Sequence, residues 1–334
     1  MSYMFLLLVG FGLLIGGGEL LVRGAVTIAE RLGMSPLLIG LVLVSFATST
    51  PEIVTSVEAA LAGSPGIAVG NIVGSNISNI LLVLGVSAII APFTVSSNAF
   101  SRDGVLVFFA AILFTAIGFL FSLDRVIGLA LMICLFSYLY FAYRQEIAAN
   151  RGEHTAAFEK VEAFGELREK PIVPNQGEAN KISKKPGVFA PIMLTIIGLI
   201  ILISGGKLLV DGALGLAHRA GISETIIGLT IVAIGTSLPE LVTSVIAALR
   251  KHGDVALGNI LGSCLYNVLG VGGMTAILSP TIIPQEIARF DNLVMVAASG
   301  FLLLFALTGT RIGRWHGAAL LGSYCTYLFV IWPK

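Results

Sequence analysis

Two glutamates, each placed directly after a proline within a long apolar stretch, are the residues of this sequence best suited to chemistry. Glu52 ends the run Thr-Ser-Thr-Pro-Glu, and Glu240 ends the run Thr-Ser-Leu-Pro-Glu 188 residues later. Ionisable residues at membrane depth are costly and mark ion or proton pathways. Two carboxylates at such a depth must be neutralised by bound cations or by protons. The pair therefore predicts a cation site.

Further oxygen-bearing side chains recur around both glutamates at the same offset. Thr48 and Glu52 share a helix face, as do Thr236 and Glu240, because each pair is four residues apart. The helix that follows carries a ladder of amides and hydroxyls, made up of Asn71, Ser75 and Asn79 in the first copy and Asn259, Ser263 and Asn267 in the second. Oxygen ligands suit Ca²⁺ and other hard cations. The lack of thiolate or imidazole in these motifs disfavours transition metals.

One Ca²⁺, two or more Na⁺, or two protons would each neutralise the two carboxylates. Because these occupants compete for the same oxygens, the set favours exchange over co-transport. A membrane-embedded hydrolase is disfavoured, since no His or Lys lies near these motifs to activate a nucleophile. A channel stays open as an alternative, because oxygen-lined filters also bind cations.

The composition is that of an integral membrane protein. Apolar residues make up 56% of the 334 residues and charged residues only 12%, against about 25% charged in soluble domains. Apolar runs long enough to cross a bilayer as helices predict ten spans, and the first of them reads as a retained span with no cleavable signal. The spans are 3–22, 36–61, 68–91, 103–121, 126–143, 188–210, 224–249, 255–279, 287–308 and 315–332.

An internal repeat organises these spans into two halves. Residues 17–79 match residues 205–267 without a gap. Since each half holds five spans, an odd number, the second copy must cross the membrane in the opposite sense. The prediction is an all-α membrane protein of ten transmembrane helices in two inverted five-helix repeats, 1–143 and 188–334, joined by a linker loop at 144–187. Inverted repeats place a substrate site near the midplane and allow alternating access.

The prolines and glycines predict where the helices break and where they slide. Pro51 and Pro239 cannot continue the helical hydrogen bonds, so the second and seventh helices should be broken there. Freed carbonyls within a membrane are tolerated when a bound ion or another group satisfies them. The glycines at 16–18 and 205–206 suggest the first and sixth spans as sliding gates.

Basic residues predict the orientation of the chain. Fifteen Lys and Arg lie on the side of the 144–187 loop and five on the other side, and positive charge marks the cytoplasm. Both termini are expected outside a cell (inner) membrane, with the polar linker in the cytoplasm. The three cysteines, Cys134, Cys264 and Cys325, show neither metal nor disulfide spacing and are expected to be buried packing residues.

At these motifs the chain resembles the calcium/cation antiporter superfamily, and prokaryotic sodium/calcium exchangers in particular. The residues that carry this resemblance are Gly-Thr-Ser-Leu-Pro-Glu at 235–240, Ala-Thr-Ser-Thr-Pro-Glu at 47–52, and the Gly-Asn-x-x-Gly-Ser pattern at 70–75 and 258–263. The resemblance implies Ca²⁺ extrusion driven by Na⁺ entry. It implies Ca²⁺ ligation by Glu52, Glu240, Thr48 and Thr236, and Na⁺ ligation by Ser49, Ser75, Ser237, Ser263 and the backbone carbonyls of Ser45 and Ala233.

Asn79 and Asn267 fall at the paired position between the halves, where some members of the superfamily carry an aspartate. Their amides argue against a co-transported potassium ion. A proton/calcium exchanger is the nearest alternative. Such relatives usually place a glutamate soon after Gly-Asn, whereas here Ile72 and Ile260 follow. No enzyme activity, catalytic residue, cofactor or nucleic-acid partner is expected. The partners are Ca²⁺, Na⁺ and the lipid bilayer, and the protein should act as a monomer.

Overall fold

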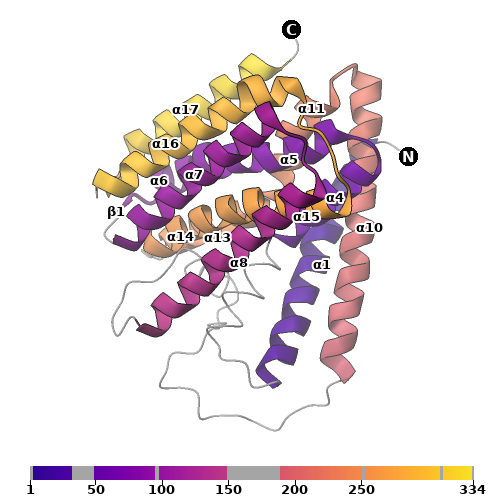
Figure 1. Cartoon of the computed structure of the whole chain (residues 1–334), viewed down its shortest axis with the longest axis horizontal. Coiled ribbons are helices and arrows are strands. Elements are labelled where there is room, and N and C mark those ends of the chain that lie inside the picture. The colour runs from indigo at the N-terminus through magenta and orange to yellow at the C-terminus, as the bar shows by residue number, and fades with distance from the viewer. Residues whose placement is uncertain are drawn as a thin grey trace.

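The computed structural model of the chain describes residues 3–31, 49–94, 98–148, 189–249, 253–308 and 311–332. This part of the chain is almost entirely helical (Figure 1), as predicted. The helices of the first half are α1 (Tyr3–Arg31), α4 (Thr50–Leu61), α5 (Pro65–Ile77), η2 (Ser78–Val83), α6 (Leu84–Ile90), α7 (Asn98–Leu120) and α8 (Arg125–Ala148). Those of the second half are α10 (Phe189–Ala220), α11 (Glu224–Ile227), η3 (Gly228–Val232), α12 (Ala233–Thr236), α13 (Leu238–Leu249), α14 (Gly253–Leu265), η4 (Tyr266–Val271), α15 (Gly272–Leu278), η5 (Ile287–Asp291), α16 (Asn292–Thr308) and α17 (Arg314–Ile331).

Within the described ranges, seven helices are long and apolar enough to cross a membrane, and an eighth span is added if the bent pair Glu224–Thr236 and Leu238–Leu249 counts as one. These spans coincide with predicted spans in both halves. Residues 36–48, half of the predicted span 36–61, lie outside the described residues, and α17 occupies the place of the predicted tenth span.

The sequence repeat extends to the boundaries of the helices. Adding 188 to the bounds of α4, α5, η2 and α6 gives the bounds of α13, α14, η4 and α15. η2 and η4 are π-helical segments, in which the backbone hydrogen bonds span five residues instead of four. Each copy of the repeat therefore breaks its regular α-helical pattern at the same place.

The seventh span is broken close to its proline, as predicted. The helix pair Glu224–Thr236 and Leu238–Leu249 bends by 45°, and Ser237 lies between them with φ −85° and ψ 2°. In the first copy, Ser49 has nearly the same angles, φ −92° and ψ 7°, and Pro51 lies in the first turn of α4. A proline in a first turn costs little, because its missing N–H would have no helical partner there. The residues before Ser49 lie outside the described ranges.

α1 and α10 lie side by side on one flank of the molecule (Figure 1). Glycines repeat every seven residues along the contact, so the two backbones approach closely. A Cβ atom added to Gly17 would lie 2.7 Å from the backbone nitrogen of Leu202, and one added to Gly198 would lie 2.5 Å from that of Leu21. The glycines of the contact are Gly10, Gly17 and Gly24 on α1 and Gly198, Gly205 and Gly212 on α10.

Short strand pairings and arginine hydrogen bonds join the two halves near the ends of their helices. β1 (Phe93–Thr94) pairs with β2 (Arg311–Ile312) in an antiparallel ribbon, and an isolated bridge joins Leu123 to Thr281. Nearby, Arg314 Nε donates to the carbonyl of Ile89 at 3.2 Å, and Arg125 Nε donates to that of Ile277 at 3.3 Å. These contacts form two matched sets. The ribbon β1–β2 corresponds to the bridge between Leu123 and Thr281, and the contact of Arg314 corresponds to that of Arg125, at offsets close to 188.

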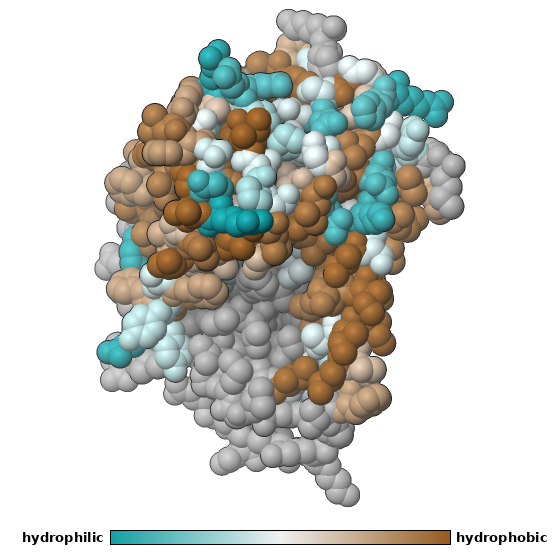
Figure 2. All heavy atoms as spheres, turned by 45° about the vertical axis from the view of Figure 1, so that its right-hand side comes forward, coloured by the Kyte–Doolittle hydropathy of each residue, from teal (hydrophilic) through white to brown (hydrophobic). Residues whose placement is uncertain are grey.

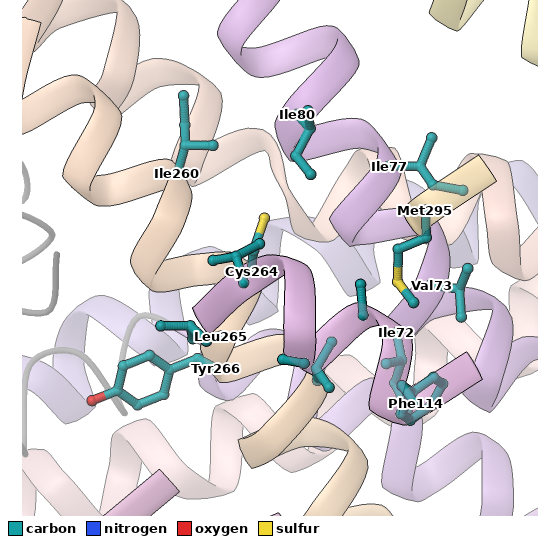
Figure 3. Close-up of a cluster of buried hydrophobic side chains, with 14 of the residues drawn as sticks. Ile72, Val73, Ile77, Ile80, Phe114, Ile260, Cys264, Leu265, Tyr266 and Met295 are labelled. Atoms are coloured by element: carbon teal, nitrogen blue, oxygen red, sulfur yellow. The ribbon is translucent and has the colours of Figure 1, made fainter. Parts of the chain in front are cut away.

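The main hydrophobic core lies where the two halves meet. Figure 3 shows Ile77 and Ile80 of the first half in the same cluster as Cys264 and Tyr266 of the second half. Cys264 is buried as predicted, but Cys134 and Cys325 are exposed, so the prediction of burial was wrong for these two. They lie on α8 and α17, whose outer faces also expose large apolar side chains such as Ile133 and Phe329.

Apolar side chains cover much of the outer surface. Figure 2 shows wide hydrophobic areas on one face of the molecule, with hydrophilic side chains mostly in the upper part of the view. A soluble monomer seldom exposes apolar patches of this extent. Together with the apolar helices, this surface defines a membrane protein. The exposed residues include Leu8, Phe109, Leu120, Val126, Phe136, Ile200 and Phe301.

Candidate ion-binding site

An asparagine on α5 braces the start of α4, where Glu52 lies. The side-chain amide of Asn71 donates to the carbonyl of Glu52 at 3.3 Å and to the hydroxyl of Ser56 at 2.9 Å. All three residues are buried, with Glu52 only 2% exposed. A buried amide that satisfies a carbonyl and a hydroxyl on the neighbouring helix fixes the rotation of that helix. Asn71 therefore helps to set the direction in which the Glu52 carboxylate points.

The second half repeats this brace with the same distances. Asn259 on α14 donates to the carbonyl of Glu240 at 3.3 Å and to the hydroxyl of Ser244 at 2.9 Å. The amide also approaches Thr243 Oγ1 at 2.8 Å. Glu240 is 3% exposed, and Ser263 Oγ, one turn further along α14, donates to Glu240 Oε1 at 3.5 Å. The two glutamates thus occupy equivalent, buried positions.

Hydrogen bonds also connect the two halves at this place. Thr236 Oγ1, on α12 of the second half, donates to Asn71 Oδ1 of the first half at 3.0 Å. Ser75 Oγ lies 3.5 Å from Thr236 Oγ1 and donates to Asn71 Oδ1 at 3.4 Å. Asn71 therefore contacts Glu52 through its nitrogen and the Glu240-bearing segment through its oxygen.

The paired amides predicted at the junction of the halves lie in two π-helical segments that the repeat relates to each other. Asn79 is in η2 and Asn267 is in η4, and both are buried. Within the described ranges, neither polar atom of the Asn79 side chain has a hydrogen-bond partner, and the same is true of Asn267 Nδ2 and Ser237 Oγ. Buried polar atoms usually find a partner. Their availability here fits residues that receive an ion or the water molecules around it.

The structure places most of the predicted ligands in this buried region. Ser49, Thr236, Ser237, Ser75 and Ser263 are each at most 2% exposed. The carbonyl of Ala233 accepts the backbone N–H of Ser237 at 3.1 Å and the hydroxyl of Thr236 at 3.4 Å. Thr48 and the carbonyl of Ser45 lie outside the described residues.

Glu52 and Glu240 are the acids of this region whose side chains the structure shows as buried. The helices α4, α5, α13 and α14 contain no Lys, Arg or His, and no group of three or more His, Cys, Asp or Glu gathers in the described part of the chain. An ionised acid in a membrane costs about 2.5–3.5 kcal/mol even on the lower scale. Two such acids among hydroxyls and amides are stabilised by hard cations or by protons.

Three features of the region were not predicted from the sequence. The role of Asn71 and Asn259 as braces was not predicted, although both had been assigned to the oxygen ladder. Thr243 was not predicted as part of the region, yet its hydroxyl accepts a hydrogen bond from the Asn259 amide at 2.8 Å. The π-helical segments were also missed. A change from α-helical to π-helical hydrogen bonding leaves no local pattern in the sequence. The paired amides Asn79 and Asn267, which lie in two of these segments, were the one available indication.

The family of the protein follows from comparison with known sequences. The model of the sodium/calcium exchanger protein family matches residues 2–144 and 190–332, so the two matched segments correspond to the two halves and leave out the linker. The chain belongs to this family.

Particular relatives match over nearly the whole chain. The putative antiporter CaxA of Alkalimonas amylolytica is 37% identical, with 98% of each chain covered. The sodium/calcium exchanger MaX1 of Methanosarcina acetivorans is 34% identical, with 98% of this chain and 97% of the relative covered. Among solved structures, the sodium-calcium exchanger NCX_Mj, soaked with 10 mM Na⁺ and zero Ca²⁺, is similar with a TM-score of 0.60, at 32% identity and with 97% of each chain covered.

Proposed function

We propose that the protein is a secondary active antiporter that exchanges Na⁺ for Ca²⁺ across the membrane, with Ca²⁺ held between Glu52 and Glu240 near the midplane. The observation that carries this proposal is the matched pair of buried glutamates, each braced by an asparagine with the same two hydrogen-bond distances. Membership of the sodium/calcium exchanger family supports cation/Ca²⁺ antiport, and the relative MaX1 is itself a sodium/calcium exchanger.

The proposed Ca²⁺ ligands are the two carboxylates together with Thr48 and Thr236. Ca²⁺ binds six to eight oxygens, so water or backbone carbonyls complete its shell. The Na⁺ ligands are proposed to be Ser49, Ser75, Ser237 and Ser263 with the carbonyls of Ser45 and Ala233, and Asn79 and Asn267 lie between the halves. Because Ca²⁺ and Na⁺ use overlapping oxygens, occupation by one excludes the other, which is the condition for exchange.

Transport follows from alternating access of this site to the two sides of the membrane. The two halves, 1–143 and 188–334, act as inverted repeats, which allow two mirror-related open states. α1 and α10 act as the moving gates, since glycines let their backbones pack together while most other helices surround the site. Without bound ions, the site carries two unneutralised charges. The change of access from one side of the membrane to the other is therefore unfavourable for the empty protein, which suppresses uncoupled movement of ions.

The membrane is the cell (inner) membrane, with both termini outside and the 144–187 loop in the cytoplasm. The excess of Lys and Arg on the side of that loop supports this orientation. A relative that is 32% identical over 98% of this chain is the inner membrane protein YrbG of Escherichia coli.

A proton/calcium exchanger is the alternative, because two protons would also neutralise Glu52 and Glu240. Two apolar residues follow each Gly-Asn motif, Ile72-Val73 and Ile260-Leu261. These positions lack the extra glutamate usual in proton-coupled relatives. The sequence therefore favours sodium.

Ca²⁺ uptake into proteoliposomes tests the proposal. Vesicles preloaded with Na⁺ should take up Ca²⁺, whereas vesicles preloaded with K⁺ at the same pH should not. Uptake that instead requires an acidic interior would make the protein a proton exchanger, and uptake that requires neither gradient would indicate a channel.

Two variants assign the activity to the site. Glu240→Gln should abolish Na⁺-driven uptake because it removes a ligand charge. Glu58→Gln serves as the matched control, since Glu58 lies in α4 and is only partly buried, and its counterpart in the second half is Ile246. Full uptake by Glu240→Gln would contradict the proposed site.

A further inference from the structure

A second pair of buried acids lies outside the ion site and is held differently in the two halves. Asp103 on α7 and Asp291 at the end of η5 are 188 residues apart, and both are buried. Neither belongs to the proposed ligand set. An acid buried in a membrane protein needs a counter-charge, a set of ligands or a proton, so the surroundings of each acid decide its chemical state.

Asp103 has a counter-charge. Arg102 Nε lies 2.8 Å from Asp103 Oδ1. The guanidinium is also positioned over the ring of Phe141 on α8, with 5.6 Å between its central carbon and the ring centroid. The guanidinium therefore gives Asp103 a charged hydrogen-bond partner.

Asp291 has a phenol where Asp103 has a guanidinium. The residue that corresponds to Arg102 is Phe290, and no Lys, Arg or His forms an ion pair with Asp291 in the described part of the chain. The hydroxyl of Tyr327, on α17, donates to Asp291 Oδ1 at 2.9 Å. Phe290 stacks on the ring of Tyr327, with centroids 6.4 Å apart and planes at 15°. At the offset of 189 that relates Arg125 to Arg314, Tyr327 corresponds to Tyr138 of α8, so the two acids differ in the residue that precedes them, Arg102 or Phe290.

In the described part of the chain, the helices packed against η5 place no basic side chain in an ion pair with Asp291. η5 packs against α5, α7 and α16. α5 and α16 contain no titratable acid or base, and the charged residues of α7 are Arg102 and Asp103, which pair with each other. Glu286 and Arg289 lie close in sequence but are exposed, and Tyr324 lies beside Tyr327 on α17 with ring centroids 6.4 Å apart. One carboxyl and one phenol are too few oxygens for a metal ion.

We propose that Asp291 and Tyr327 form a proton-binding site, in which Asp291 is a neutral carboxylic acid at neutral pH. Tyr327 donates to Oδ1, and Oδ2 carries the bound proton. The site is connected to the ion-binding region by packing, because η5 contacts α5, which carries Asn71, and α17 contacts η2, which carries Asn79. Loss of the proton would place a charge between these helices.

Infrared spectroscopy of the full-length protein in liposomes tests the site directly, since a protonated carboxyl gives a C=O stretching band that a carboxylate lacks. The spectrum at neutral pH should lose one such band in Asp291→Asn and should keep it in the matched control Asp103→Asn. Spectra of the wild type and Asp291→Asn that agree in this region would overturn the proposal.

Two further variants test the partners and do not depend on the folding of Asp291→Asn. Tyr327→Phe should move the band to higher frequency, because the carbonyl loses its hydrogen bond, and an unmoved band would show that Tyr327 is not part of the site. Phe290→Arg copies the first half, and it should remove the band by pairing Asp291 with a guanidinium. A band that survives this change would contradict the inference that the missing guanidinium keeps the proton on Asp291.

Discussion

The hydroxyl of Thr236 in the second half donates to the amide oxygen of Asn71 in the first half, at 3.0 Å. The amide nitrogen of the same asparagine holds the carbonyl of Glu52. Any movement of the Thr236 segment relative to α5 must therefore break or stretch a buried hydrogen bond next to one of the proposed Ca²⁺ ligands. This relationship makes Thr236 both a ligand candidate and a contact between the halves.

Thr236→Val should weaken Ca²⁺ binding, because it removes a ligand oxygen and leaves Asn71 Oδ1 without its donor from the second half. The loss of a buried hydrogen bond costs about 1–3 kcal/mol, which corresponds to roughly tenfold or more in the apparent Kd. The Ca²⁺ concentration that gives half-maximal Na⁺-driven uptake measures this change. Thr236→Ser, which keeps the hydroxyl, should behave nearly as the wild type, and an equal loss in both variants would rule out the hydroxyl as the cause.

Asn71→Leu and Asn259→Leu should each lower the melting temperature of the purified protein. Both changes leave a buried carbonyl and a buried serine hydroxyl without their amide donor, at a cost of about 1–3 kcal/mol for each unsatisfied group. Asn76→Leu is the matched control on α5, since the Asn76 amide donates only to the carbonyl of Ile72 in its own helix. A control variant as unstable as Asn71→Leu would show that any buried amide has this effect.

Gly17→Leu should reduce transport strongly, whereas Gly16→Leu should not. A Cβ on Gly17 meets the backbone of α10 at 2.7 Å, but one on Gly16 meets nothing within 4 Å. A side chain at Gly17 must force α1 and α10 apart, which alters the proposed gates. Rates of Na⁺-driven Ca²⁺ uptake, normalised to the amount of protein in the vesicles, measure the difference. Similar rates for the two variants would show that the close contact between α1 and α10 is not required for transport.

Ca²⁺ should protect the wild type against thermal unfolding, and Glu52→Gln should abolish this protection. A ligand that binds only the folded protein stabilises it by about 2.7 kcal/mol at a concentration one hundred times its Kd. The melting temperature, recorded with and without Ca²⁺, gives the comparison, and Glu58→Gln should retain the full shift. If Ca²⁺ raised the melting temperature of Glu52→Gln as much as that of the wild type, the ion would be bound elsewhere.

The set of candidate site residues could be predicted from the sequence because the repeat displays it twice. Polar residues that recur at one offset inside apolar spans, such as Glu52 and Glu240, have few explanations other than a site. The proline motif also predicted the bend of the seventh span, since the effect of proline on a helix is local. These predictions rest on residue types and short spacings, both of which are visible in one chain.

Other features depend on contacts between distant segments and could not be predicted. The hydrogen bond between Thr236 and Asn71 requires the relative placement of two helices. The outward position of Cys134 and Cys325 depends on which face of α8 and α17 meets lipid, and these helices are too uniformly apolar for the sequence to distinguish their faces. The hydrogen bond between Asp291 and Tyr327 likewise joins two helices that are distant in the sequence, whereas the pairing of Asp103 with Arg102 joins neighbouring residues.

The close contact between α1 and α10 also constrains how the protein is made. α1 begins at residue 3, and its partner begins at residue 189, so the ribosome must synthesise the whole first half and the linker before the contact can form. Until then, the glycine-lined face of α1 has no partner from its own chain and must be tolerated by lipid or by the insertion machinery. The packing of α1 is thus completed late, and assembly of the protein is coupled to synthesis of its second half.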